Sequence, residues 1–181
     1  MERTVTRRSS HFASQVSPLQ GFLTDGDEER RDVSEAKRWL VVASRQAVDS
    51  LIESLRRWAL NQPDIRGIAL VGSFARGNFH AESDVDFVII TSAKDKSIQL
   101  ICDDFVFDRS IGFRIEEWGI LTSLRVYYDG SLEVEYGLVS DEWVHEPLDA
   151  GTKEVVLNGF KVVLDKDNIF GAVTRFIDRN R

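Results

Sequence analysis

The sequence predicts an α/β fold in which a β-sheet is flanked by helices and preceded by a long N-terminal amphipathic helix. Three observations predict it. Apolar residues recur every three or four positions from Ala36 to Trp58, a spacing typical of a helix with one buried face. Short β-branched runs follow at Gly67–Val71 and Asp84–Thr91, and they favour strands. Two further apolar runs flank Asp129-Gly130, which indicates a hairpin turn.

The N-terminal part divides at about residue 32. Residues 1–32 mix Ser, Thr, Gly and Pro and end in a run of charges, so we predict a mobile tail here and a single domain over 33–181. Asp32 or Ser34 can cap the long helix. The helix should stop near Asn61, because Pro63 disfavours helical geometry in the residue before it.

The remaining elements are predicted in order along the chain. The apolar residues of Ile98–Glu117 fit neither the helical nor the strand period, so we expect a helix or an irregular excursion there. The hairpin strands are Gly119–Tyr128 and Leu132–Val139. The last part contains a helix at Thr152–Leu157 ended by Asn158-Gly159, a strand at Phe160–Leu164 and a closing helix at Asn168–Arg179.

Composition bounds the function. The chain has 181 residues, of which 43% are hydrophobic and 29% charged, so it can bury the core of one domain. Its formal net charge of −7 makes nucleic acid a poor partner. The single cysteine, Cys102, cannot form an internal disulfide, and no apolar run reaches the length of a membrane span. We therefore expect a cytoplasmic protein without a membrane partner.

Two neighbouring motifs carry chemistry. Gly72-Ser73 and Gly77 lie in a turn directly after a buried strand, where glycine lets backbone N–H groups approach a phosphate. Asp84 and Asp86 then occupy positions i and i+2 of the next strand. They project from one face, and their oxygens suit hard divalent cations.

Each motif alone has a structural explanation, either a plain turn or a solvated strand edge. Together they favour a site, because carboxylates at the end of an otherwise apolar strand are costly unless they bind metal or are paired. Other phosphate motifs fit poorly. The dinucleotide fingerprint needs glycine where Phe74 stands, and the P-loop needs Gly-Lys-Ser/Thr where Gly77-Asn78-Phe79 stands.

The combined segment resembles the nucleotidyltransferase superfamily, whose pattern is Gly-Ser, a few residues, Gly, and then Asp-x-Asp leading a hydrophobic strand. The details Ala75-Arg76-Gly77 and Ser83-Asp84 resemble the minimal and aminoglycoside-type branches most. The resemblance covers about Ile65 to Thr91. It implies a mixed sheet, a nucleoside triphosphate substrate and Mg²⁺, with two ions held by Asp84, Asp86 and a third carboxylate.

The resemblance places the third carboxylate on a later strand, and Leu132–Gly137 supplies two candidates on one strand face. We prefer Glu135, because an apolar strand continues after it and Gly137 leaves space on the same face. Glu133 is the alternative. Both glutamates could instead form the exposed face of a hairpin. The resemblance also implies nucleotide-binding roles for five residues, which are Gly72, Ser73, Arg76, Gly77 and Ser83.

The resemblance implies transfer of a nucleoside monophosphate, with AMP preferred, to a hydroxyl acceptor, with release of pyrophosphate. The acceptor would be a small hydroxyl compound or a protein. About forty residues follow Val139, too few for the helical domain of the aminoglycoside-type enzymes. We therefore expect the acceptor to bind between protomers of a homodimer, on a partner chain, or near Ile98–Glu117. The alternative functions are an antitoxin-like subunit that binds a helical toxin, and a nucleotide sensor without turnover.

Overall fold

The computed structural model describes residues 45–180. The predicted tail over 1–32 and the first part of the predicted long helix lie outside these residues. The first helix is described from residue 45 to residue 60 and ends one residue before the predicted end at Asn61. Lys166 Nζ donates hydrogen bonds to the carbonyl oxygens of Ala59 and Gln62, so a residue distant in sequence helps to satisfy the end of this helix.

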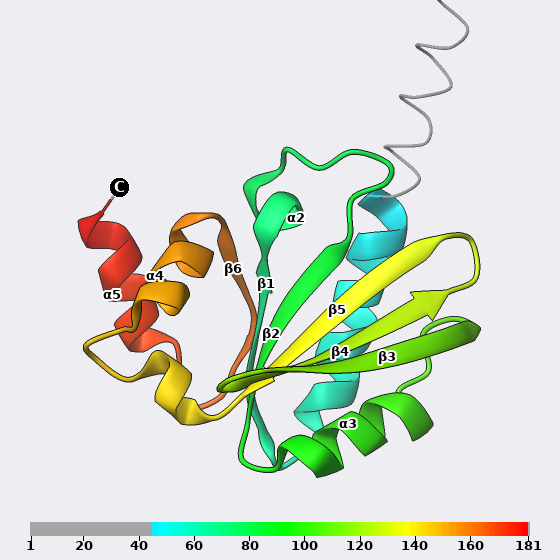
Figure 1. Cartoon of the computed structure of the whole chain (residues 1–181), viewed down its shortest axis with the longest axis horizontal. Helices are drawn as coiled ribbons and strands as arrows, with labels where there is room; N and C mark the ends of the chain where they lie inside the picture. The colour runs from blue at the N-terminus through cyan, green and yellow to red at the C-terminus, as the bar shows by residue number, and fades with distance from the viewer. Residues whose placement is uncertain (1–44, 181) are drawn as a thin grey trace, which may run out of the picture.

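The elements that follow are strands and short helices (Figure 1). They are β1 (Ile65–Val71), α2 (Gly72–Arg76), β2 (Val85–Thr91), α3 (Lys94–Asp103), β3 (Ser110–Trp118), β4 (Leu121–Tyr128), β5 (Leu132–Val139), the 3-10 helix η1 (Asp141–Val144), α4 (Ala150–Leu157), β6 (Phe160–Asp165) and α5 (Gly171–Arg179). This order confirms the predicted α/β class. None of the helices described between residues 45 and 180 is long and apolar enough to cross a membrane.

The six strands form one mixed sheet in the order β3-β4-β5-β2-β1-β6. Only β2 and β5 run parallel, and every other neighbouring pair is antiparallel. Because β2 is followed by α3 and the β3–β4 hairpin before β5 begins, the chain can return to the sheet in the same direction. This parallel pair lies at the centre of the sheet, where the two carboxylate-bearing segments of the sequence become neighbours.

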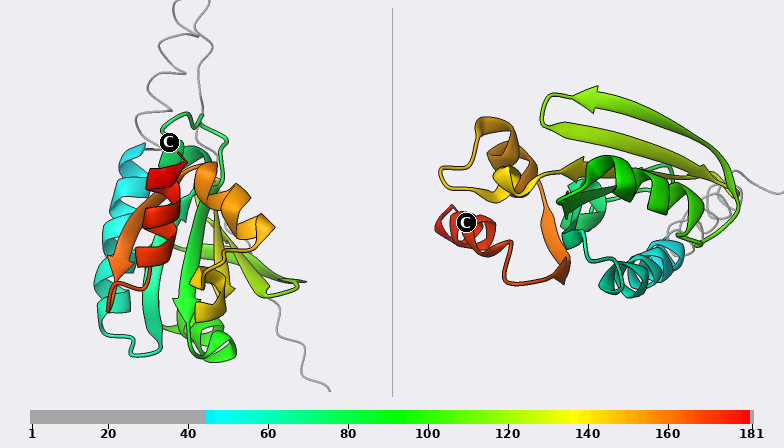
Figure 2. Two further views of the ribbon diagram at one scale, coloured as in Figure 1. Left: turned by 90° about the vertical axis from the view of Figure 1, so that its left-hand side faces the viewer. Right: turned by 90° about the horizontal axis from the view of Figure 1, so that it is seen from below.

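Different helices cover the two faces of the sheet. The first helix, through Leu51 and Leu55, and α3, through Ile101, pack on a core that includes Phe87 and Tyr136. The other face is covered over part of its area by η1, α4 and α5, which pack through Trp143, Val156 and Val173 on Val88 and Ile90. Figure 2 shows α4 and α5 beside the β6 end of the sheet, away from the first helix. No described helix packs on the rest of this second face.

The prediction for Ile98–Glu117 was wrong in one respect. The structure has helix α3 at Lys94–Asp103, a loop, and then strand β3. The strand has the period-two pattern Ile111, Phe113, Ile115, but β3 is an edge strand and these side chains are exposed. A buried face requires apolar and polar residues to alternate along a strand. No such face is buried along the whole length of this edge strand, so the alternation in its sequence is weak.

The β4–β5 hairpin is present, but its turn differs from the predicted one. Positive φ angles occur at Gly130 (81°) and Ser131 (67°) and not at Asp129. Tyr128 pairs with Leu132, so the loop has three residues and its second and third members adopt the left-handed conformation. Three-residue loops that end in this conformation are common in hairpins. The register is the one that places Arg125 opposite Glu135.

Candidate active site

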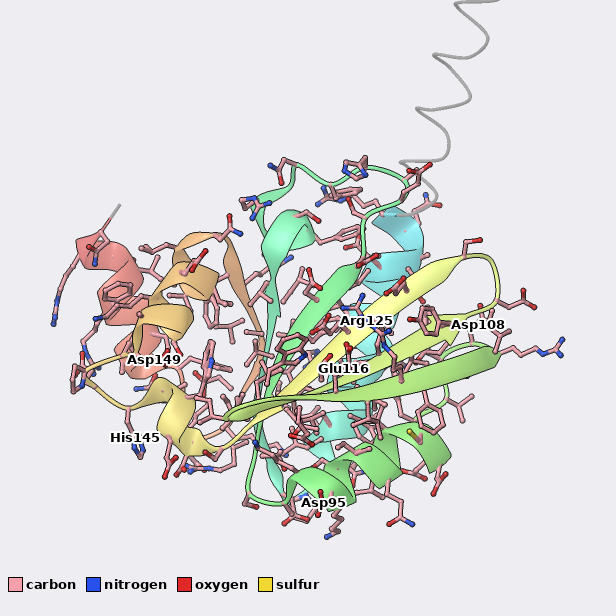
Figure 3. The ribbon with its side chains drawn as sticks, viewed as in Figure 1. Asp95, Asp108, Glu116, Arg125, His145 and Asp149 are labelled. Carbon is pink, nitrogen blue, oxygen red and sulfur yellow. The ribbon has the colours of Figure 1, made fainter. Side chains whose placement is uncertain are left out.

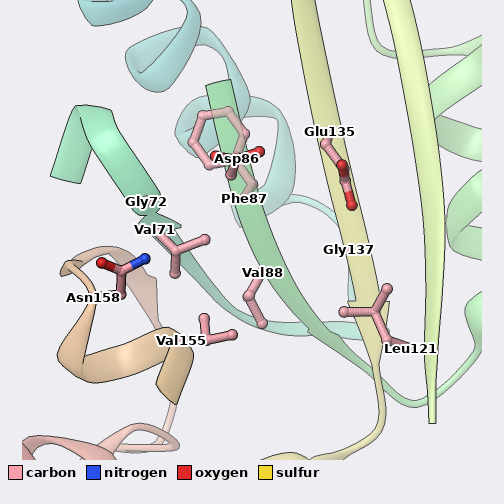
Figure 4. Close-up of a pocket in the computed structure, with 10 residues that line it drawn as sticks. All are labelled: Val71, Gly72, Asp86, Phe87, Val88, Leu121, Glu135, Gly137, Val155 and Asn158. Carbon is pink, nitrogen blue, oxygen red and sulfur yellow. The ribbon is translucent and has the colours of Figure 1, made fainter. Parts of the chain in front are cut away.

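Four carboxylates gather on the open face of the sheet. Asp86 on β2 and Glu135 on β5 are directly paired in the parallel register. Asp84 and Glu133 lie two residues earlier on their segments and therefore face the same side. Asp86 and Glu135 line the same hollow in Figure 4. The pairing of β2 with β5 thus joins two groups of acidic residues that are about fifty positions apart in the sequence.

Arg125 on β4, labelled in Figure 3, forms ion pairs with three of these carboxylates. One guanidinium nitrogen, Nη1, is 2.5 Å from Glu133 Oε1 and 3.6 Å from Asp84 Oδ2. The other, Nη2, donates to Glu135 Oε2. The guanidinium therefore holds both glutamates of β5 in place. Among the described ion pairs of this group, Arg125 is the one cation beside four carboxylates, so negative charge is in excess.

The excess charge is most pronounced at Asp86, which has no ion-pair partner among the described residues. Burial, together with the neighbouring Glu135 and Asp84 and against the opposing effect of Arg125, raises the pKa of the Asp86 carboxyl to about 6. Burial also raises the pKa of Asp84, with a further contribution from Glu133. A cation bound beside Asp86 would lower the free energy of its ionised form.

The glycine of the Gly-Ser motif is required by two features of the structure. Gly72 begins α2 with φ of +68°, a conformation that side chains strain. A Cβ at this position would lie only 2.6 Å from Asp86 Oδ2. A side chain at residue 72 would therefore force the Asp86 carboxylate to shift from its present position against the backbone of α2.

A cleft extends on both sides of Asp86. Its apolar part has a volume of about 250 Å³, with Leu121 on one wall and Val155 on the other (Figure 4). Its polar part is more open, at about 410 Å³, and is lined by Ser73, Arg76, Ser83 and Asp84 among others. Gly72, Asp86 and Asn158 line both parts. The carboxylates thus lie between an apolar chamber and a polar one.

Most residues predicted from the sequence line this cleft, and the local contacts define their positions. Arg76 donates to the carbonyl oxygen of Asn158, and its Nε lies 3.1 Å from Asn78 Oδ1. Ser83 Oγ accepts a hydrogen bond from the backbone N–H of His80 at 3.0 Å. Gly77 does not line the cleft. It ends α2 with φ of +78°, and an added Cβ would meet nothing within 4 Å.

Sequence reasoning did not identify two parts of the site, Arg125 and the α4–β6 turn. Arg125 could have been found from the hairpin. If Asp129–Ser131 form the loop, Tyr128 pairs with Leu132, and counting back along both strands pairs Arg125 with Glu135. The α4–β6 turn had no local signal. Gly159 has φ of +122°, and a Cβ there would lie 2.7 Å from the carbonyl oxygen of Gly72, so this turn packs directly on α2.

The donor set suits a hard divalent cation, because it consists of carboxylate oxygens with too little positive charge around them. Between residues 45 and 180, however, no three side chains of His, Cys, Asp or Glu are already placed to hold a metal ion. Two of the four carboxylates, Glu133 and Glu135, instead accept hydrogen bonds from Arg125. Metal binding by this set would require Glu135 to exchange its contact with Arg125 for the cation.

Comparison with known proteins gives one family match. The model of the nucleotidyltransferase domain family matches residues 48–148, which is more than half of the chain. No curated protein matches the chain.

Three solved structures are similar at low identity. A cytoplasmic RNA terminal U-transferase is 15% identical, with a TM-score of 0.38, over 62% of this chain and 37% of that one. The Cid1 poly(U) polymerase is 14% identical, with a TM-score of 0.35, over 62% and 32%. A toxin–antitoxin structure with AMP-PNP is 15% identical, with a TM-score of 0.33, over 73% and 85%. The chain thus spans about a third of the length of the first two.

Proposed function

Because the chain belongs to the nucleotidyltransferase domain family, we propose that it transfers a nucleoside monophosphate from a nucleoside triphosphate to a hydroxyl acceptor. The observation that carries this proposal is the pairing of Asp86 with Glu135 across two parallel strands, beside the backbone of Gly72. The acceptor oxygen forms a bond to the α-phosphorus as the bond from that phosphorus to the bridging oxygen breaks. Pyrophosphate then leaves with the electron pair of the broken bond.

In this proposal Asp84, Asp86 and Glu135 hold Mg²⁺, and two ions fit the excess of carboxylates. Bound divalent ions would neutralise charge on the phosphate oxygens and lower the pKa of the acceptor hydroxyl. The chain's own residues do the rest. Ser73 and Arg76 line the polar part of the cleft, where they can donate to phosphate oxygens. Glu135 lies beside the apolar part and can accept the proton of the acceptor hydroxyl.

The contacts favour Glu135 over Glu133 as the third carboxylate. Glu135 is in register with Asp86 and lines the cleft, whereas Glu133 does not line it. Glu133 Oε1 is 2.5 Å from Arg125 Nη1, so Glu133 can keep the guanidinium when Glu135 turns to a cation. We therefore assign Glu133 the role of the fixed partner of Arg125.

The two parts of the cleft suggest the nucleotide donor and the hydroxyl acceptor of the proposed transfer. Ser83 and Arg76 on the polar side suit the triphosphate, and we propose ATP as the donor. Leu121 and Val155 on the other side suit an acceptor with an apolar portion, such as a small hydroxyl compound or a protein side chain. The net charge of −7 disfavours a nucleic acid acceptor. The exposed, unpaired Cys102 fits a reducing cytoplasmic location.

Thermal unfolding tests nucleotide binding. The chain is unfolded with ATP, GTP, CTP or UTP, each with and without Mg²⁺, beside the double variant Asp84→Ala, Asp86→Ala. At about 100 times its dissociation constant, a ligand of the native state adds about 2.7 kcal/mol of stability. We expect a Mg²⁺-dependent rise in melting temperature for the wild type and none for the double variant. The matched control is Asp103→Ala on α3, an exposed carboxylate.

Transfer is tested with triphosphate labelled at the α-phosphate. We expect label to move to an acceptor as pyrophosphate appears, and Glu135→Gln to lower the rate at least about 100-fold, since it removes a group that contacts the reacting atoms. Glu133→Gln should lower it less than about tenfold by the same reasoning. Equal losses in the two variants would contradict the assignment of Glu135. Unchanged transfer by the Asp84, Asp86 double variant would refute the proposed site.

One observation favours a second candidate function. Arg125 donates hydrogen bonds to Glu133 and Glu135. A guanidinium that occupies two of the four carboxylates is compatible with a subunit that binds nucleotide or a helical protein partner without turnover. Pyrophosphate release separates the two functions. A Mg²⁺-dependent thermal shift without pyrophosphate, across small-molecule and protein acceptors, would favour the binding subunit.

A further inference from the structure

The outer edge of β3 has no strand partner in the described part of the chain. β3 stands at one end of the sheet and pairs only with β4. At nine residues it is the longest strand of the sheet, and it contains neither proline nor lysine. Proteins usually protect such edges with short strands, proline, lysine or a covering element. The opposite edge strand, β6, follows that rule, because it has six residues, carries Lys161 and contacts α2 and α4.

The segment around β3 is also the most apolar exposed region described. Ten large hydrophobic residues are exposed between positions 45 and 180, and five of them lie in Ile111–Ile120. Phe113 is 59% exposed, and Trp118 is 66% exposed. Exposed apolar side chains gathered on one strand favour an interaction site.

The apolar side of β3 continues the hydrophobic core. Phe113 pairs with Val126 and Ile115 pairs with Leu124, and both β4 residues are buried in the core beneath the first helix and α3. Within residues 45–180, the core therefore reaches this edge of the sheet with no element covering it. A strand added along β3 would cover part of the exposed surface of Ile115 and Phe113, and it would pair with the edge backbone groups that have no strand partner among the described residues.

We propose that the occupant is β3 of a second copy of this chain, paired antiparallel about a two-fold axis at Ile115. In this register Arg114 of each copy lies opposite Glu116 of the other. Within one chain the two side chains already share a face and form an ion pair at 3.1 Å (Figure 3 labels Glu116). Opposite charges placed directly across two antiparallel strands are favourable, so β3 is complementary to itself.

Charge pairing and the regularity of the strand together favour this register over its neighbours. An axis at Arg114 would place the two arginines opposite each other, and like charges in that position are unfavourable. An axis at Phe113 would centre the pairing next to the irregularity between Ser110 and Gly112. The axis at Ile115 instead places Trp118 opposite Gly112. A Cβ added at Gly112 would have no neighbour within 4 Å, so the space beside this glycine is empty. The indole can therefore pack over the space at the glycine.

The pairing has a consequence for the cleft. A two-fold axis perpendicular to the sheet preserves its faces, so the carboxylate clefts of both copies open on the same side of one continuous sheet. The β3–β4 turn of each copy, which leads into Leu121 at the cleft wall, lies close to the joint. Any effect of the pairing on catalysis in the cleft depends on the proposed function, whereas the pairing itself does not.

The test is the mass of the full chain in solution without nucleotide, measured by light scattering and sedimentation over a wide range of concentrations. We expect twice the monomer mass of 20.6 kDa at high concentration. Arg114→Glu and Glu116→Arg should each raise the dimer dissociation constant at least about tenfold, since each creates two like-charge pairs. The double variant Arg114→Glu, Glu116→Arg should return it to within about threefold of the wild type. Arg57→Glu, on the exposed side of the first helix, is the charge-reversal control.

Each other outcome overturns the proposal. A monomer at every concentration refutes the pairing, and a dimer that neither single variant weakens uses another surface. Single variants that weaken the dimer without rescue by the double variant contradict the Arg114–Glu116 exchange. Hydrogen exchange at β3 adds a check. Protection of its amides in a monomer, independent of concentration, would mean that another part of the same chain covers the edge. None of these outcomes depends on nucleotide binding, so they are distinct from failure of the proposed function.

Discussion

The two sides of strand β2 have opposite roles. Val85, Phe87 and Ile89 point into the core beneath the first helix and α3, where Phe87 is 1% exposed. On the other side, Asp84 and Asp86 face the cleft, and only further along the strand does that side become covered again, at Val88 and Ile90. One strand therefore stabilises the fold with one side and carries charge with the other. The difference indicates that stability and chemistry can be changed separately in this protein.

The largest expected effect on stability comes from the buried side. Phe87 stacks on Tyr136 with ring centroids 5.9 Å apart. Phe87→Ala should lower the free energy of unfolding by about 3–5 kcal/mol, because it removes buried surface and leaves a cavity. Urea unfolding measures this change. Val106→Ala, at a residue that is 84% exposed, is the control and should change stability by less than about 0.5 kcal/mol. Similar losses in both variants would contradict the role assigned to the buried side.

On the cleft side the expected change has the opposite sign. The pKa of Asp86 is raised to about 6, above the value of about 3.9 for an unfolded chain, so the native state holds the proton more tightly. Ionised Asp86 therefore costs stability, and the cost grows from about pH 4 to pH 6 and then remains constant. Asp86→Asn should raise the stability of the metal-free protein at pH 7 by about 1–3 kcal/mol, while it abolishes transfer.

Paired unfolding curves of wild type and Asp86→Asn, in the presence of a chelator at pH 7 and pH 4, test this prediction. The gain should be present at pH 7 and vanish near pH 4. Asp103→Asn on α3 serves as the control and should show no gain at either pH. A variant less stable than the wild type at pH 7 would show that Asp86 stabilises the fold and is not a strained functional group.

Two glycines of one motif sharpen the comparison. Gly72 and Gly77 both have positive φ, but only Gly72 abuts Asp86. Alanine at either position strains the backbone by about 1 kcal/mol. Gly72→Ala adds the clash with the carboxylate, so we expect a stability loss of about 2 kcal/mol and at least tenfold slower transfer. Gly77→Ala should keep transfer within about threefold of the wild type. Similar kinetics in the two variants would mean that backbone strain alone accounts for the effect.

The smallest expected effect concerns α4, which forms a wall of the cleft. Asp149 caps this helix, with Oδ1 accepting from the Thr152 N–H at 3.0 Å. Asp149→Ala should lower the free energy of unfolding by about 1 kcal/mol, and Asp149→Asn, which keeps a capping oxygen, by much less.

The capping contribution should also depend on pH. The hydrogen bonds from Thr152 lower the pKa of Asp149. The capping contribution of its charge is therefore complete above the ordinary pKa and is lost as pH falls through the lowered one. Thermal unfolding of the three proteins from pH 7 downward would show a constant difference if the charge has no part in the cap.

Much of the fold could be predicted because its determinants are local. The helix end before Pro63, the hairpin at Asp129-Gly130 and the strands around the Gly-Ser and Asp-x-Asp motifs depend on residues close together in the chain. Strand β3 was missed because an edge strand with exposed side chains shows only a short alternating pattern. The α4–β6 turn was missed as part of the cleft because its contact with α2 joins segments more than eighty residues apart.

The candidate site divides in the same way. By itself the sequence determined the motif chemistry, since spacing along one strand is sufficient to place Asp84 and Asp86 on one side. Only the tertiary structure decided which carboxylates meet. The parallel pairing of β2 with β5 puts Glu135 beside Asp86, and the pairing of β4 with β5 brings Arg125 among them. Strand order and register depend on packing of the whole sheet, and charges interact through space and not along the chain, so these contacts exist only in the folded protein.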